Sequence, residues 1–490
     1  MQDHTPMFDR RTLLTATSAL GLIGLPHISF AQQPSSPPSA KPLTAVLAYF
    51  IARFDLKNAP PEAIDRARVA FIDTMGVMLA GSHEEVSHLV VEMVKLEGAT
   101  PAASIVGQSL RTSPQLAALA NGVAGHAMDY DLSYLSGQAV APVIPAVLAL
   151  AESTGAVPPD CIAAFIVGCE VASRLVRASP RISNDGGWHS TGVVGSVAAA
   201  AACAKLIKVP VERIANVLGI AVSLASGTAV NYGTMTKPLH SGNAARNGVL
   251  AASLGKTGFT SHETALEGTA GYFATFSRGL QISLEPFNDI GRRFDLVEMG
   301  YSIKAYPCGG RGHTAIEAAL ALRERIGARL GDIANIHCSV SRSSAQRINA
   351  KWPQDVEAAK FSAAYVIAYS LVHGAPRIPA FTEQALKDER VKALAQFVTA
   401  GGDPELSDAF GESPAKLKIT LRDGQTFEQR RDYATGSKMV PMTRVQLDDK
   451  FMDCAAQVVS ADVAKKILAS LNTFPERRSF DDFWTLVRKA

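Results

Sequence analysis

A chain of 490 residues, of which 47% are hydrophobic and 7% aromatic, has enough apolar side chains for more than one globular domain. The formal net charge is only +3, with no long basic run and no interleaving of basic and aromatic residues, which argues against nucleic acid as a partner. The six cysteines include no C-x-x-C pair, so their spacing offers no zinc finger.

The N-terminus has the pattern of an export signal. Arg10 and Arg11 precede a short apolar stretch, and Ala31 offers a cleavage point. We predict a twin-arginine-type signal peptide over 1–31, which would use the twin-arginine export machinery and deliver the protein to the periplasm. The apolar stretch is short for a spanning helix, so we expect no stable membrane insertion. A disordered basic tail is the alternative. Residues 32–42 are rich in Pro and Ser and are predicted to form a linker.

Apolar residues recur at helical spacing through most of 43–299, where strand-like alternation is almost absent. One helix is expected to begin at Pro60-Pro61, because proline suits a first helical turn, and to end at Gly81. We therefore predict the first part of a large helical domain over 43–299. Its other main helices are expected at 115–127, 143–154, 160–176, 191–205, 211–226, 242–256 and 261–265.

The pattern changes after residue 300. Residues 333–341 and 416–431 are predicted strands, and Asp423-Gly424 indicates a hairpin turn within the second run. We predict an inserted α+β lid domain over 300–438 and C-terminal helices over 439–490 that complete the helical domain. The expected fold class is mainly α with an α+β part, and the cleft between the two domains is the expected ligand site.

Four short segments carry side chains that can move protons or hold an anion. They are the helix end with His126, Asp129, Asp131 and Ser133, the segment Gly186–Gly192 with His189, the pair Lys237 and His240, and the glycine-rich turn with Arg311 and His313. Helix starts near the last three would add partial positive charge. Each segment also has an ordinary structural explanation: a capped helix end, an Ala-rich core helix, or a plain turn.

The small residues after His240 predict a helix, with its N-terminus near Lys237 and His240, that packs very closely on a neighbour. Burial beside Trp188 would keep the His189 imidazole neutral and basic. Arg311 could bind a carboxylate in a two-pronged contact. The chain contains no G-x-S-x-G, no H-E-x-x-H and no convincing dinucleotide fingerprint, so we expect no organic cofactor and no metal.

Several segments, taken in order and spacing, resemble the MmgE/PrpD family, which includes 2-methylcitrate dehydratase, cis-aconitate decarboxylase and iminodisuccinate epimerase. The resemblance covers roughly 43–471. The matching pieces are FIDTMGVMLAG, NGVAGHAMDYD, APVIPAVLALAE, GWHSTG, KPLHSGNAARNG, GFTSHETALEG and KAYPCGGRGHTAIEA. The resemblance implies a helical domain with an inserted lid, a homodimer and a small polycarboxylate substrate.

The resemblance also places polar site positions at Asp129, His189, Lys237 and His313, with His240 close by. Ser133 stands where relatives often have Thr. Gln138 stands where relatives commonly have a histidine, and it cannot titrate.

Reactions of this family share a carbanion-like state next to a carboxylate. We interpret His189 and Lys237 as base and acid, Asp129 as an orienting or proton-handling group, and Arg311 and His240 as contacts for substrate carboxylates. The sequence favours a cofactor-independent lyase, most of all a hydro-lyase acting on a di- or tricarboxylate.

Four alternatives to the hydro-lyase stay open. They are an epimerase or isomerase, a decarboxylase, a non-catalytic carboxylate-binding protein, and a metal hydrolase built on His126, Asp129 and His189.

Overall fold

The computed structural model describes residues 42–135, 137–183, 186–409 and 412–488. The predicted signal peptide and all but the last residue of the predicted linker lie outside these ranges, so export stays a prediction. Within the described ranges, no helix combines the length and the apolar character needed to cross a bilayer.

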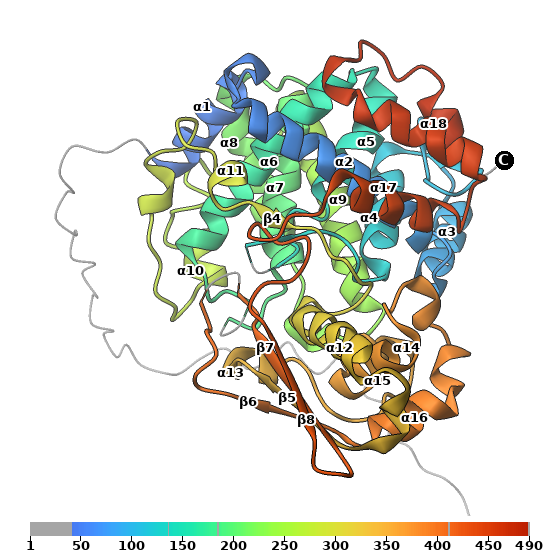
Figure 1. The fold of residues 1–490 in the computed structure, drawn as a ribbon. Helices are drawn as coiled ribbons and strands as arrows, with labels where there is room; N and C mark the ends of the chain where they lie inside the picture. The colour runs from blue at the N-terminus through green and yellow to red at the C-terminus, as the bar shows by residue number, and fades with distance from the viewer. Residues whose placement is uncertain (1–41, 136, 184–185, 410–411, 489–490) are drawn as a thin grey trace, which may run out of the picture. The chain divides into compact units, whose positions relative to one another are not determined.

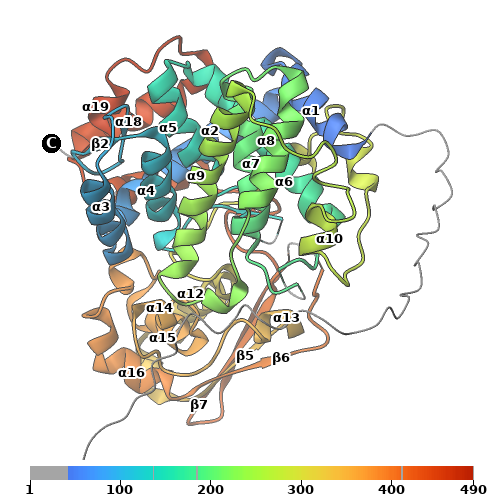
Figure 2. The same ribbon diagram turned by 180° about the vertical axis from the view of Figure 1, so that it is seen from behind.

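The larger region is an assembly of helices around one hydrophobic core (Figures 1 and 2). It confirms the expected mainly α class. The helices of its first part are α1 (Leu43–Arg53), α2 (Pro61–Gly81), α3 (Glu85–Glu97), α4 (Pro114–Ala127), α5 (Val143–Thr154), α6 (Pro158–Ala178), α7 (Ser190–Leu206), α8 (Val211–Leu224), α9 (Thr236–Thr257), α10 (Tyr272–Phe276) and α11 (Asp295–Glu298). Two short ribbons accompany them, β1 (Ala103–Ser104) with β2 (Arg111–Thr112), and β3 (Ser133–Tyr134) with β4 (Tyr301–Ser302).

Glycines set the spacing between α9 and its neighbours α4 and α7. A Cβ on Gly122 of α4 would lie 2.8 Å from the Cα of Gly242 on α9, and a Cβ on Gly248 would lie 2.5 Å from the Cβ of Ala199 on α7. Real side chains do not fit at such distances, so the small residues let three helix backbones approach one another. The close packing predicted for this helix is confirmed, and it brings the first turns of α9 to the ends of α4 and α7.

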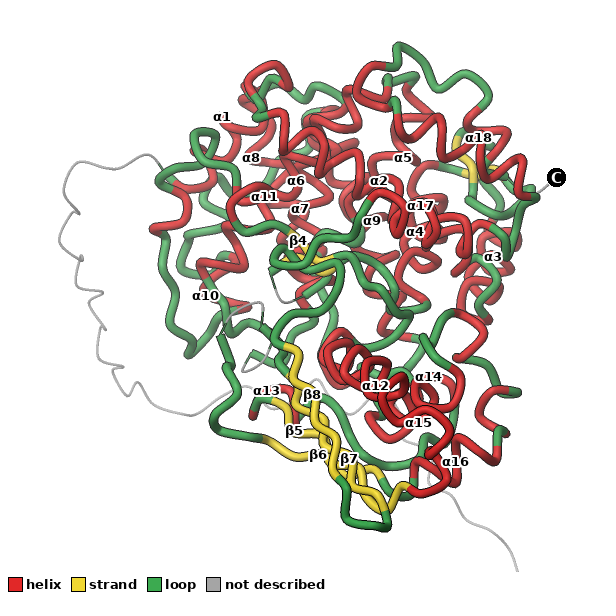
Figure 3. Tube along the Cα trace, in the orientation of Figure 1, coloured by secondary structure: helices red, strands yellow, loops and turns green. Residues whose placement is uncertain are grey.

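The smaller region has its own core, formed where helices cover one face of a four-stranded sheet (Figure 3). The strand order is β6-β5-β7-β8, with β5 and β6 parallel and the other pairs antiparallel. Gly424 takes the positive φ that the predicted hairpin requires. The elements are α12 (His313–Ile326), β5 (Ile333–Val340), α13 (Arg342–Ala345), α14 (Val356–Ala359), α15 (Ala363–His373), α16 (Glu389–Ala395), β6 (Val398–Gly402), β7 (Ala415–Leu421) and β8 (Thr426–Arg431).

The C-terminal helices are α17 (Arg444–Ala455), α18 (Ala461–Asn472) and α19 (Phe483–Leu486). The first two pack on α2, beside which they are drawn in red in Figure 1. Whether the smaller region moves as a lid stays a prediction.

Two helix predictions were wrong in detail. Residues 261–265 form no helix, and 263–265 lie in turns, because the run is too short for propensity alone to nucleate a helix. Helix α9 starts at Thr236, earlier than expected, so Lys237 and His240 belong to its first two turns instead of preceding it.

Candidate active site

Asp129 lies at the centre of the candidate site, just after α4 ends. Its φ of 51° is left-handed, a conformation that Asp tolerates better than most residues. Lys237 Nζ from α9 lies 2.5 Å from Oδ1, and Lys304 Nζ lies 2.7 Å from Oδ2. Lys304 also donates to the Asp129 carbonyl oxygen at 2.6 Å. One buried carboxylate is therefore held between two buried ammonium groups.

The electrostatics of this arrangement favour an anion. Burial by itself would raise the pKa of Asp129, but Lys237 and Lys304 outweigh it and hold the pKa far below its usual value. Burial would likewise lower the pKa of Lys237, whereas the ion pair with Asp129 raises it. Asp129 is thus ionised and Lys237 is protonated at neutral pH, and the Asp129 carboxylate lies between two lysine side chains.

Further amide and ammonium groups surround the loop that carries Asp129. Gln138 Nε2 donates to Asp129 Oδ1 at 3.1 Å, so the residue in the place of the usual histidine still contacts the cluster. Lys360 Nζ donates to the Ala127 carbonyl at 3.2 Å, and Lys450 Nζ donates to the Tyr130 carbonyl at 2.9 Å. These contacts from distant segments fix the backbone of the loop.

Two histidines meet beside the lysines. His189 occupies the N-cap position of α7 with only 2% of its surface exposed, and its Nδ1 lies 3.0 Å from Nδ1 of His240 on α9. Burial lowers the pKa of His189 well below the usual value, and the positive charge on Lys237 contributes. The prediction that burial keeps His189 neutral therefore agrees with its surroundings. The Tyr232 ring lies edge-on to the His189 ring at 5.0 Å.

His126 and Asp131 form a second imidazole–carboxylate pair in the site. Both Asp131 oxygens lie 3.0 Å from His126 Nδ1, and the His126 ring stacks on the His189 ring at 5.6 Å. Nε2 of His126 is buried without a hydrogen-bond partner. Because Asp129 is held by lysines and His126 by Asp131, these donors do not converge as the metal alternative would require. No cluster of three metal-binding side chains is found among the described residues.

Of the two predicted site residues in the glycine-rich turn before α12, only His313 lies near the Asp129 cluster. His313 is buried and lies near Cys308 O at 3.4 Å, and burial together with the charge on Lys304 lowers its pKa to about 3. Arg311 does not join the cluster, since its guanidinium donates to the Glu412 carbonyl and to Ser413 Oγ.

Ser133 is held in the β3–β4 ribbon, where its backbone pairs with Ser302. No side-chain hydrogen bond joins it to the lysines among the residues described. Of the eight predicted site residues, the structure thus brings together Asp129, Gln138, His189, Lys237 and His240. His313 lies close enough for the charge on Lys304 to lower its pKa.

Sequence reasoning missed Lys304, which supplies the second cation. It lies at the start of the KAYPCGG segment, two residues after β4, and nothing in its spacing from Asp129 signals a contact. The pairing of β3 with β4 brings it there. Tyr232 was also missed, because it lies in a polar loop without a recognisable motif.

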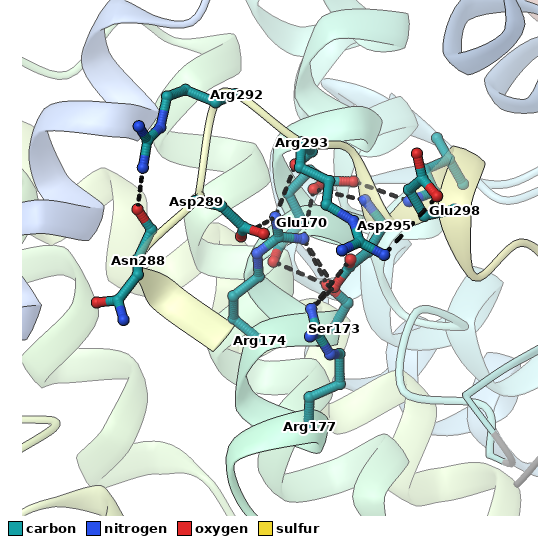
Figure 4. Close-up of polar contacts among 11 residues, drawn as sticks. Glu170, Ser173, Arg174, Arg177, Asn288, Asp289, Arg292, Arg293, Asp295 and Glu298 are labelled. Carbon is teal, nitrogen blue, oxygen red and sulfur yellow. Dashed lines mark hydrogen bonds and ion pairs between the residues drawn. The ribbon is translucent and has the colours of Figure 1, made fainter. Parts of the chain in front are cut away.

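A second buried charged cluster, around Glu170 and Arg174, lies within the helical region (Figure 4). Arg174 Nη1 lies 2.6 Å from Glu170 and 2.8 Å from Asp295, and Arg177 lies 2.9 Å from Asp295. Glu170 also accepts the backbone N–H groups of Asp295 and Leu296. Burial raises the pKa of Glu170 to about 7, against the opposing charge of Arg174. These contacts fasten the segment around α11 to α6.

Comparison with known proteins gives matches along most of the chain. The model of the MmgE/PrpD N-terminal domain matches residues 45–285, and that of the MmgE/PrpD C-terminal domain matches 306–473. Cis-aconitate decarboxylase of Homo sapiens is 27% identical over 466 residues, which cover 91% of this chain and 95% of that protein. The Mus musculus enzyme of the same name is 28% identical, covering 87% and 90%, and that of Aspergillus terreus is 27% identical, covering 87% and 91%.

Proposed function

Because the chain belongs to the MmgE/PrpD family, we propose that the residues around Asp129 are the active site of a lyase that acts on a small polycarboxylate. The observation that carries the proposal is the pairing of one carboxylate with two ammonium groups next to a neutral imidazole. The spare positive charge would bind a substrate carboxylate and stabilise negative charge that develops next to it. His189 would move the proton at the neighbouring carbon.

Within this class we favour decarboxylation of an unsaturated tricarboxylate of the cis-aconitate type. The support is that relatives named cis-aconitate decarboxylase align with 87 to 91% of this chain. Loss of CO₂ leaves an electron pair on carbon, which the lysines stabilise while a proton is delivered to that carbon. His189 is a buried imidazole of the cluster, and we assign the proton transfer to it.

The hydro-lyase reaction favoured by the sequence is the second candidate. It is supported by the presence of a neutral base, His189, and a protonated acid, Lys237, in one site, since elimination of water uses one of each. An epimerase would need the base but no acid for a leaving group.

The test is to incubate the purified chain with cis-aconitate and, separately, with saturated hydroxytricarboxylates. Release of CO₂ with an unsaturated dicarboxylate as product supports the decarboxylase. A new C=C absorbance without CO₂ identifies the hydro-lyase, and solvent deuterium in recovered substrate without net reaction identifies the epimerase. Tight binding without any of these would contradict the proposal of an enzyme.

Lys304→Met serves as the variant that tests the charge argument. Removing a charge-assisted hydrogen bond costs about 1.5–3 kcal/mol, which is about 10- to 150-fold in affinity for the carboxylate. The matched control is Lys205→Met, because Lys205 also donates to backbone carbonyls but lies outside the cluster. Equal affinity in the Lys304 variant and wild type would contradict the assigned role.

Two further parts of the proposal concern the whole protein. The homodimer that the family resemblance implies is tested by sedimentation. Periplasmic export is tested by changing Arg10 and Arg11 to Lys, which should leave the precursor in the cytoplasm.

A further inference from the structure

The contact between His189 and His240 restricts which nitrogen of each ring can carry a proton. Their Nδ1 atoms are 3.0 Å apart, and a hydrogen bond between two imidazole nitrogens needs one N–H and one lone pair. When both rings are neutral, the ring that donates through Nδ1 has a bare Nε2. The ring that accepts through Nδ1 carries its proton on Nε2. The two tautomers are therefore complementary.

The backbone around Gly227 builds this contact. The His189 N–H donates to the Gly227 carbonyl at 2.9 Å, and Trp188 forms a β-bridge with Thr228. Gly227 has a φ of 122°, and a Cβ on it would lie 3.1 Å from Cγ of His240. One glycine thus fixes the backbone of one histidine and supports the ring of the other. The packing of α9 on α4 and α7 sets the remaining position of His240.

The two rings differ in their access to water. His189 is almost fully buried, whereas His240 is partly exposed. Neither Nε2 atom has a hydrogen-bond partner among the residues described. The pair therefore extends from the buried cluster to the surface, with one free nitrogen at each end.

The charges around the pair make a protonated His189 costly. Lys237 from α9 and His126 from α4 face both rings, and Tyr232 and Asp129 also face His189. Burial and the positive neighbours lower the pKa of both histidines. A proton that reaches His189 Nε2 is best accommodated if the Nδ1 proton leaves at the same time.

We propose that His240 is a proton-relay residue, which acts through His189 and exchanges protons between that residue and water. In the outward direction, His189 Nε2 takes a proton from substrate carbon while its Nδ1 proton passes to Nδ1 of His240. His240 then releases its Nε2 proton to water, so one proton has crossed and both rings are neutral with exchanged tautomers. The inward direction reverses each step and delivers a proton to carbon. The relay rests on the proposed function, and His240 takes this role instead of the substrate-carboxylate contact expected from the sequence.

The kinetic test uses two variants of His240 and one control. His240→Asn keeps a hydrogen-bonding group near the position of Nδ1 but cannot relay, and His240→Ala leaves room for added imidazole. The control is His262→Asn, because His262 is exposed and lies outside the site. With cis-aconitate as substrate, we expect kcat of His240→Asn to fall about 100-fold with KM unchanged, which is the lower end of general acid–base losses.

Rescue separates a relay from a merely structural role. Imidazole and its methylated derivatives should restore kcat of His240→Ala in proportion to their basicity. The relay is overturned if His240→Asn retains wild-type kcat, or if folded His240→Ala loses activity that no added imidazole restores.

A measurement without turnover distinguishes failure of the relay from failure of the proposed function. In protein labelled with ¹⁵N-histidine, the wild type should show one protonated and one bare Nδ1 for this pair, and His240→Asn should shift the His189 signals. Two bare Nδ1 atoms would overturn the relay even in an active enzyme. Absence of turnover with every carboxylate, together with the expected ¹⁵N pattern, would contradict the proposed function alone.

Discussion

Two buried charged clusters contact the helical region, and their charges are paired in different ways. Around Glu170, three carboxylates share two guanidinium groups, and backbone N–H groups complete the contacts. Around Asp129, two ammonium groups share one carboxylate, the Asp131 carboxylate pairs with His126, and the neutral His189 and His240 lie alongside. Burial is common to both, so burial alone does not indicate function. The sharing of one carboxylate by two ammonium groups next to neutral imidazoles distinguishes the candidate site from a structural network.

The largest expected effect is a loss of turnover on substitution in the Asp129 cluster. His189→Gln should lower turnover by ~10²–10⁴-fold, the usual range for losing a general acid or base, while the melting temperature stays near that of the wild type. Steady-state kinetics and thermal unfolding of the same preparation check both parts. Wild-type turnover in this variant would remove His189 from the mechanism.

The converse change should act on stability. Arg174→Met leaves the buried Glu170 and Asp295 carboxylates without their central cation, and we expect the free energy of unfolding to fall by about 3–5 kcal/mol. Below its melting temperature the variant should keep wild-type kcat. Denaturant unfolding measures the loss, and Arg177→Met, which alters a partly exposed arginine, should cost less. A normal unfolding curve for Arg174→Met would contradict the structural role.

A pH series should move the stability contributions of the two clusters in opposite directions. His313 has a pKa near 3 in the folded state and about 6.5 when unfolded, so the unfolded state binds more protons in between. Its contribution to stability is therefore lost as the pH falls below about 6.5. Glu170 has a pKa of about 7 in the folded state, above its usual value of 4.5. Its contribution is present below about 4.5 and is lost as the pH rises through 7.

Unfolding of His313→Gln and Glu170→Gln across this pH range tests both signs. Relative to the wild type, the first variant should lose less stability on acidification, and the second should lose less as the pH rises through 7. The same sign in both variants would contradict the assigned protonation states.

The smallest effect is expected at the edge of the site. Arg311 donates to the 412–413 segment and not to the Asp129 cluster. Arg311→Lys should therefore raise KM by less than Lys304→Met does. The check is steady-state kinetics of both variants on the same substrate. A larger rise in KM for Arg311→Lys than for Lys304→Met would instead support the predicted contact between Arg311 and a substrate carboxylate.

The sequence predicted those parts of the fold that depend on local patterns. Hydrophobic periodicity located α4 and α5 almost to the residue, and Asp423-Gly424 located the hairpin, because each signal lies within one element. The run 261–265 was mispredicted because a short helix depends on packing that the local sequence does not contain. Lys304 was missed for a related reason, since its contact with Asp129 depends on a ribbon that joins residues 169 positions apart.

The two cations of the site lie on different segments, and Lys304 stands between Ile303 of the larger core and Tyr306 of the smaller one. Lys237 belongs to a helix of the larger core, whereas Lys304 lies on the strand-exit segment that leads into the smaller one. In a chimera of two family members, the position of the junction relative to residue 304 decides which parent supplies the second cation. With a junction just after Lys304, both lysines come from the first parent. With a junction just before it, the second parent supplies residue 304. Exchange of the smaller region therefore replaces one of the two anion-binding cations only when the junction precedes Lys304.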